Sequence, residues 1–132
     1  MSIIIDTNTI PKVFNPQDSQ HSDFEPVFDW IHCGTGTMVY GGTKYSSELN
    51  KMQRYAQLIK LYRDKRKVII LNRDEVDNKE NDLKQIAVHG GFNDHHVIAI
   101  AIVSDCKLVC TVDHAAIPFM KKSIFYHCRP AR

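Results

Sequence analysis

The chain has 132 residues, the usual length of one domain with its own hydrophobic core, and we expect residues 1–132 to form a single domain. Hydrophobic residues make up 43% of the chain and charged residues 24%, a balance typical of soluble globular proteins. The longest apolar stretch, Val97 to Val103, is too short to span a bilayer, and the start of the chain lacks the basic residues of a signal peptide. We therefore expect a cytoplasmic protein without a membrane partner.

The net charge of +2 is only mildly basic, but charge is unevenly distributed along the chain. Eight basic residues and two acids lie between Lys44 and Lys67, whereas five acids and one lysine lie between Asp74 and Asp82. A basic helix face beside an acidic crevice would suit a polyanionic ligand. The same pattern also fits a solvated, lysine-rich helix surface, and the sequence leaves both interpretations open.

The four cysteines, Cys33, Cys106, Cys110 and Cys128, are consistent with a reducing compartment. Cys110 and Cys128 lie in apolar runs, so we expect reduced and partly buried thiols. The spacing of Cys106 and Cys110 is a poor match to paired zinc ligands, and we expect no structural zinc site.

The first third of the chain contains two predicted strands. Residues 2–5 form a short apolar run without alternation, as expected for a strand buried on both faces, and residues 6–8 supply turn chemistry after it. A short helix is expected over 26–33, where apolar residues show partial helical spacing. A second strand over 38–40 is followed by a tight turn at Gly41 and Gly42.

The middle of the chain is mostly helical. Apolar residues recur at three- and four-residue spacing over 44–65, which predicts one long helix with Thr43 as its cap. A buried strand is expected over 68–71 and a helix with an acidic start over 74–88, ended by the turn residues 89–91. The run 97–103 alternates large and small residues, as a strand would. The Asn93-Asp94 start and the length favour a helix over 94–105, capped by Asn93.

The last elements complete an alternation of strands and helices. We expect a strand over 107–112, a short helix or turn over 115–120 and a last strand over 124–127. Alternating strands and helices predict an α/β fold of three layers, α/β/α, in which helices cover both faces of a central parallel sheet.

Four acidic residues follow predicted strands or lie in the first turns of predicted helices: Asp6, Glu48, Asp94 and Asp113. In an open α/β sheet these places converge on one edge, where ligands bind. Carboxylates gathered there repel one another unless a cation neutralises them, which indicates a divalent-metal site and phosphodiester chemistry. Each acid alone also has an ordinary interpretation as a turn, cap or surface residue. The hypothesis of a metal site therefore depends on the four acids together.

The order of these motifs resembles the PIN-domain ribonucleases, which include the VapC-like toxin nucleases. Ile4-Ile5-Asp6-Thr7-Asn8 is similar to the family's opening strand and first acid, and Glu48 to its second. Phe92-Asn93-Asp94-His95-His96-Val97-Ile98-Ala99 and Lys107-Leu108-Val109-Cys110-Thr111-Val112-Asp113 resemble the blocks that carry the third and fourth acids. The resemblance spans nearly the whole chain, but residues 16–37 follow no clear family pattern, and many members lack histidines after the third acid.

The resemblance implies a PIN-like fold and a divalent-metal-dependent endoribonuclease that cleaves single-stranded RNA, often the toxin of a toxin–antitoxin pair. Mg²⁺ or Mn²⁺ would be held by Asp6, Asp94 and Asp113, with Glu48 as a ligand or as the group that orients the water. Asn8 and Thr111 are candidates to hold these carboxylates in place. The candidates for contact with RNA are Lys44, Lys51, Arg54, His95 and His96. The expected partners are RNA, an antitoxin protein and a second copy of the chain in a homodimer.

Two alternatives remain open from the sequence. The chain would be a catalytically silent PIN-like module that binds RNA or protein if its acids hold no metal. An aspartyl-phosphate phosphotransfer domain is less favoured, because Asn8 stands where that chemistry commonly needs a second acid. The aromatic residues Phe24, Phe28 and Trp30 fit either a partner interface or the core.

Overall fold

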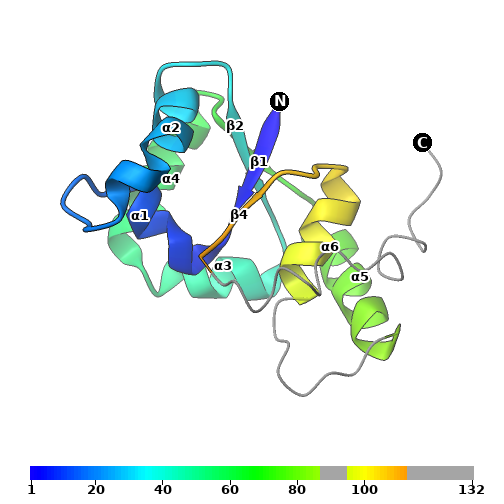
Figure 1. Ribbon diagram of the computed structural model, residues 1–132. Coiled ribbons are helices and arrows are strands. Elements are labelled where there is room, and N and C mark those ends of the chain that lie inside the picture. The colour runs from blue at the N-terminus through cyan, green and yellow to red at the C-terminus, as the bar shows by residue number, and fades with distance from the viewer. Residues whose placement is uncertain (87–94, 113–132) are drawn as a thin grey trace.

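The computed structural model describes residues 1–86 and 95–112 and shows an α/β fold built on a parallel sheet (Figure 1). The four strands of the described residues are β1 (Ser2–Ile5), β2 (Thr37–Tyr40), β3 (Val68–Ile70) and β4 (Val109–Cys110). They are arranged in the order β3-β2-β1-β4. All pairings are parallel, with Ile3 beside Met38 and Ile5 beside Cys110. The expected fold class is confirmed.

The helices cover both faces of this sheet. They are the 3₁₀ helix η1 (Thr7–Thr9) and the α-helices α1 (Ile10–Phe14), α2 (His21–His32), α3 (Thr43–Asn50), α4 (Gln53–Asp64), α5 (Arg73–Ile86) and α6 (His95–Ser104). Helices α1, α2 and α4 lie on one side of the sheet, and α5 and α6 lie on the other (Figure 1). Helix α3 runs across the end of the sheet where β1 stops, which places its residues beside the carboxyl ends of the strands.

The strand order creates a switch point between β1 and β4. The chain passes from β1 to β2 and β3 in one direction and then returns to the other side of β1 for β4. Connections that leave two adjacent strands in opposite directions open a crevice at their carboxyl ends, and ligands of open α/β proteins bind there. Asp6 directly follows β1, and Thr111 directly follows β4.

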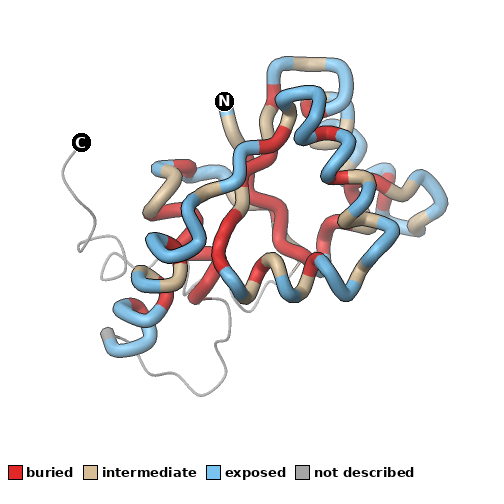
Figure 2. Tube along the Cα trace, turned by 180° about the vertical axis from the view of Figure 1, so that it is seen from behind, coloured by how far each residue is buried: buried red, intermediate tan, exposed pale blue. Residues whose placement is uncertain are grey.

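The core lies along β1, β2 and α6 (Figure 2). Ile4 and Ile5 of β1 are fully buried, and every residue of α6 from His95 to Ile102 is buried. A helix that is apolar on all sides needs such an environment, because it has no face to present to water. The helical interpretation of this segment is therefore confirmed, and the strand interpretation is wrong.

The segment expected as one helix over 44–65 is divided into α3 and α4. The chain leaves helical geometry at Met52, where φ is −108° and ψ is 66°. The apolar spacing continues on both sides of this break, so periodicity alone does not reveal it. The change of direction lets α3 cross the end of the sheet while α4 packs against β3.

Three other boundaries also differ from the expectation. Helix α2 begins at His21 and contains Pro26 within it, instead of starting there. Thr43 is the first residue of α3, and Gly42 precedes it with φ of 90°, a conformation that favours glycine. Strand β3 is an edge strand whose Ile69 and Ile70 are about half exposed, so the expectation of a fully buried strand was wrong.

Some expectations fall outside the described residues. These are the turn at 89–91, the cap Asn93, the segment 115–120, the strand over 124–127 and Cys128. Within the described residues Cys33 is exposed and Cys106 and Cys110 are buried, all as free thiols. None of the described helices is both long and apolar enough to cross a membrane.

Candidate active site

Asp6 lies at the switch point between β1 and β4. Its backbone N–H donates to the carbonyl of Cys110 at 2.9 Å, so the residue continues the pairing of the two strands. Its side chain makes no hydrogen bond to the helix that follows. The carboxylate oxygen Oδ2 instead accepts a hydrogen bond from the Thr111 hydroxyl at 3.1 Å. Asp6 is therefore a buried carboxylate held from the neighbouring strand end, and the contact expected for Thr111 is present.

The environment of Asp6 opposes its charged form. Burial raises the pKa of Asp6 above its ordinary value, and the Glu48 carboxylate raises it further. The hydrogen bond from Thr111 and the His96 ring act in the opposite direction without cancelling the rise. A buried carboxylate that resists ionisation in this way is the electrostatic setting that a bound cation relieves.

Glu48 approaches the same edge from α3. Its Oε1 atom accepts a hydrogen bond from the Thr7 hydroxyl at 3.0 Å, and its side chain is 37% exposed. The helix is anchored below this point by Tyr45, which is fully buried and whose hydroxyl donates to the carbonyl of Ile5. Glu48 is thus hydrogen-bonded to the residue that directly follows Asp6.

His96 of α6 lies against Glu48. Its Nε2 atom is 3.3 Å from Glu48 Oε1, and the residue is only 2% exposed. Neither ring nitrogen makes a hydrogen bond of good geometry within the described part of the chain. Burial lowers the pKa of His96, and the Glu48 carboxylate opposes this shift. The ring is a buried polar group pointed at a carboxylate of the site.

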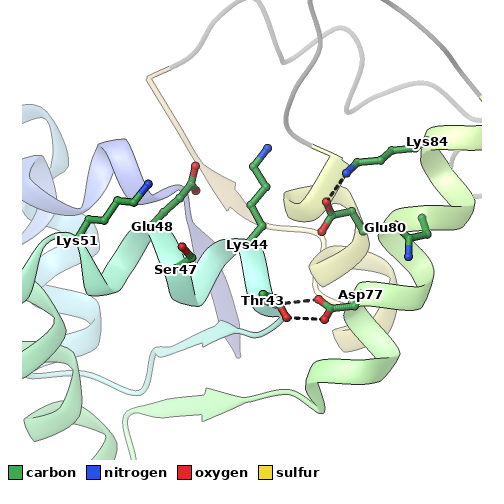
Figure 3. A pocket seen from close by; sticks show the side chains of 9 residues that line it. Thr43, Lys44, Ser47, Glu48, Lys51, Asp77, Glu80 and Lys84 are labelled. Carbon is green, nitrogen blue, oxygen red and sulfur yellow. Dashed lines mark hydrogen bonds and ion pairs between the residues drawn. The ribbon is translucent and has the colours of Figure 1, made fainter.

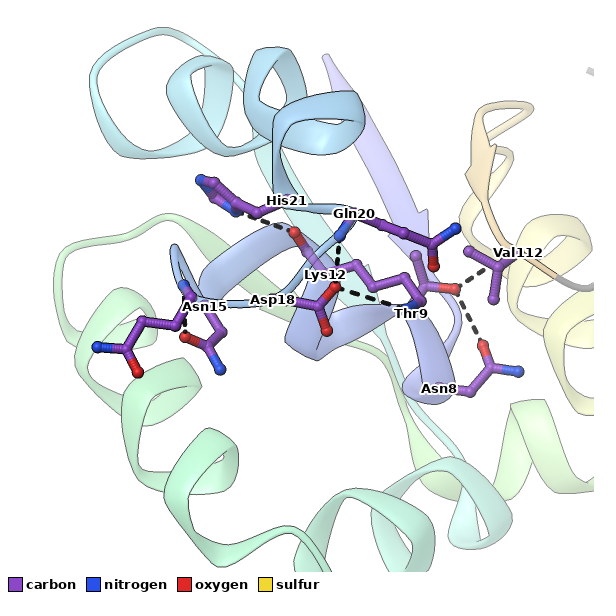
Figure 4. Close-up of polar contacts among 9 residues, drawn as sticks. Asn8, Thr9, Lys12, Asn15, Asp18, Gln20, His21 and Val112 are labelled. Atoms are coloured by element: carbon purple, nitrogen blue, oxygen red, sulfur yellow. Dashed lines mark hydrogen bonds and ion pairs between the residues drawn. The ribbon is translucent and has the colours of Figure 1, made fainter.

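A second set of contacts joins the end of η1 to the residues that follow β4 (Figure 4). The Thr9 hydroxyl accepts a hydrogen bond from the backbone N–H of Val112 at 3.1 Å and donates to the Asn8 side chain at 2.9 Å. The Asn8 amide oxygen therefore serves this link and has no described contact with the Asp6 carboxylate. Its expected role in holding the carboxylates of the set stays a prediction.

A groove opens beside Glu48, between α3 and α5 (Figure 3). Its volume is about 580 Å³. It is lined by Thr43, Lys44, Ser47, Glu48, Lys51, Asp77, Glu80, Asn81 and Lys84. Lys44, Glu48 and Lys51 project from the same side of α3 along it, as residues four and three positions apart do on a helix.

The RNA-contact candidates divide into three groups. Lys44 and Lys51 line the groove, whereas Arg54 is absent from its lining and its guanidinium lies 5.6 Å from the centre of the Tyr55 ring. His95 and His96 are both buried in α6. Asp94 and Asp113 lie outside the described residues.

Sequence reasoning missed four contributors to this region. Thr7 holds Glu48, Thr9 links η1 to β4, and Tyr45 supports the end of β1. Glu80 of α5 is buried and pairs with Lys84 at 2.9 Å. The sequence did offer a signal for Thr7: it directly follows Asp6, and the residue after an acid at a strand end lies at the same edge of the sheet. Phe24, Phe28 and Trp30 pack against the core, which favours the core interpretation of these aromatics.

The donors present suit a hard divalent cation. Asp6 and Glu48 offer carboxylate oxygens, the ligands that Mg²⁺ prefers, at a place where burial already raises the pKa of Asp6. Among the described residues no three His, Cys, Asp or Glu side chains form a complete ligand group.

Comparisons with protein-family models, with curated proteins and with solved structures found no match for this chain.

Proposed function

We propose that this protein is a divalent-metal-dependent endoribonuclease of the PIN-domain type that cleaves single-stranded RNA. One observation carries the proposal. Asp6 directly follows β1 at the switch point of an all-parallel sheet, and Glu48 of α3 is hydrogen-bonded to the next residue, Thr7. Each of the two carboxylates accepts a hydrogen bond from a threonine hydroxyl. Such hydroxyls keep carboxylates in place without adding a cation that would neutralise them.

The four acids of the sequence would hold the metal, namely Asp6, Glu48, Asp94 and Asp113. Of these four acids, Asp6 and Glu48 lie among the described residues. A bound Mg²⁺ or Mn²⁺ would supply an activated water and neutralise charge on the phosphodiester.

The protein's own groups would position the substrate. Lys44 and Lys51 lie on the same side of α3 as Glu48, along the groove that leads away from it. A single RNA strand carries one negative charge per nucleotide and is attracted by such a row of lysines. Thr7 and Thr111 would keep Glu48 and Asp6 directed at one phosphate while the strand lies in the groove.

The proposal is tested by cleavage of a fluorescent single-stranded RNA in the presence of Mn²⁺ or Mg²⁺. Asp6→Asn and Glu48→Gln should each lower the rate by about 100-fold or more, because each removes a charge that stabilises the reaction. The matched controls are Asp64→Asn and Glu75→Gln, which change exposed acids on α4 and α5. Full activity in Asp6→Asn, or equal losses in the controls, would contradict the proposal.

Three further measurements test separate parts of the proposal. Isothermal titration should detect Mn²⁺ binding to the wild-type chain and weaker binding to Asp6→Asn. Light scattering with size exclusion tests the homodimer that the family resemblance implies. If the nuclease acts as a toxin, expression of the wild-type chain should arrest growth, whereas expression of Asp6→Asn should not.

A further inference from the structure

The Glu48 carboxylate is held on one oxygen only. The Thr7 hydroxyl donates to Oε1 at 3.0 Å, and the Nε2 atom of His96 lies 3.3 Å from the same oxygen. No described contact engages Oε2. Both neighbours lie at Oε1 and come from different elements, η1 and α6.

No other described group interacts with the ring nitrogens of His96 through a hydrogen bond. It is 2% exposed, and neither nitrogen has a hydrogen-bond partner of good geometry in the described residues. A buried imidazole without partners costs free energy, so a well-packed protein seldom carries one on an otherwise apolar helix. The residues that follow on α6, Val97 to Ile102, are all apolar and buried. A leucine or isoleucine would be the ordinary choice at position 96.

The charges around the ring also favour this interpretation. Four charged groups contribute to the electrostatic environment of His96. Three are acids, namely Glu48, Asp6 and Glu80 of α5, and one is a cation, Lys44 of α3. The ring is buried against the Glu48 carboxylate. A neutral imidazole carries a proton on one nitrogen and can donate it in a hydrogen bond to Glu48.

We infer that His96 is a positioning residue for Glu48: its Nε2–H and the Thr7 hydroxyl together hold Oε1, so that Oε2 is directed into the metal site. The inference rests on the proposed function, because it assigns Oε2 the metal as its ligand. Partners of this kind typically change metal affinity by about 10- to 100-fold when they are removed.

The test uses three substitutions that differ in which atom they supply. His96→Gln places an amide N–H near the position of Nε2, His96→Asn reaches only as far as Nδ1, and His96→Leu fills the space with apolar atoms. Mn²⁺ affinity, measured by isothermal titration on the full chain, should fall by about 10- to 100-fold in the Leu and Asn variants. The Gln variant should recover most of the affinity. A residue that only packs in the core would give the reverse order, with Leu harmless and Gln the worst.

A second readout does not depend on the metal. Nitrogen-15 NMR of the imidazole should show the Nε2–H form of His96 in the metal-free protein, and its signal should move in Glu48→Gln. Unfolding by urea identifies any variant that fails to fold. The positioning role alone would be overturned by unchanged Mn²⁺ affinity in His96→Leu. It would also be overturned if the imidazole is in the Nδ1–H form and its NMR signal is the same in Glu48→Gln. A wild-type chain that binds no Mn²⁺ would overturn the proposed nuclease, and the positioning role with it.

Discussion

The Thr111 hydroxyl donates a hydrogen bond to Asp6 across a separation of 105 positions in the chain, at 3.1 Å. This contact joins the residue after β4 to the residue after β1, at the switch point of the sheet. It also makes the buried Asp6 carboxylate depend on a single described side-chain donor. The contact therefore links the stability of the fold to the geometry of the proposed site.

Thr111→Val should destabilise the metal-free protein by about 1–3 kcal/mol at neutral pH, because it removes a donor from a buried carboxylate at nearly constant side-chain shape. The pKa of Asp6, already raised by burial, should rise further. The charge-dependent part of the loss should vanish as the pH falls below the ordinary value of 3.8, where Asp6 is protonated in both folded and unfolded states. Urea unfolding at several pH values measures this. Thr37→Val, which removes an exposed hydroxyl contact to Met1, is the control and should cost little.

The pKa of Asp77 is shifted in the opposite direction from that of Asp6. Burial disfavours its charged form, but the backbone N–H and the hydroxyl of Thr43 donate to it at 2.8 Å and 2.6 Å, and its pKa is lowered. A lowered pKa stabilises the folded state above the ordinary value of 3.8 and ceases to do so as the pH falls through the folded pKa. Asp77→Asn should therefore destabilise the protein at neutral pH and have progressively less effect below about pH 4. Asp74→Asn, an exposed acid of the same helix, is the control. An equal effect of both substitutions at neutral pH would contradict the role of Thr43.

Lys51→Ala should weaken the binding of single-stranded RNA and make it less sensitive to salt. Each lysine that neutralises one phosphate of a single strand contributes about 0.7 to the slope of log affinity against log salt concentration. Fluorescence anisotropy with Glu48→Gln as the background avoids cleavage during the titration. Lys60→Ala, an exposed lysine of α4 outside the groove, should leave the slope unchanged. The groove would be the wrong binding surface if both variants lower the slope equally.

The cysteines should differ strongly in reactivity. Burial raises the pKa of Cys110 to about 11, and the Asp6 charge contributes. Since the thiolate is the reactive form, alkylation of Cys110 at about pH 8 should be about 100-fold slower than that of a thiol of ordinary pKa. Cys33 is exposed and serves as the internal comparison. Peptide mapping by mass spectrometry gives both rates in a Cys128→Ser background. Equal rates would show that the carboxyl end of β4 is open to solvent.

The sequence by itself determined the class of the fold. Apolar runs of four or five residues, alternating with segments of helical spacing, are enough to predict a parallel sheet between helices, because both patterns report which residues face the core. The same local patterns located β1, β2 and α6 closely and identified Asp6, Glu48 and Thr111. They also indicated that these residues would meet, since parallel strands deliver their carboxyl ends to one edge.

Only the tertiary structure decided how the site is assembled. The break at Met52 leaves the helical spacing intact, so nothing local shows that α3 turns across the sheet and carries Glu48 to Asp6. Ile69 and Ile70 are as apolar as the residues of β1, yet they are half exposed because β3 is an edge strand, and that depends on strand order. The placement of His96 beside Glu48 follows from the packing of α6 on the sheet. Hydrophobic spacing specifies which face of an element is buried, but the partner that each buried polar group meets depends on contacts between residues far apart in the chain.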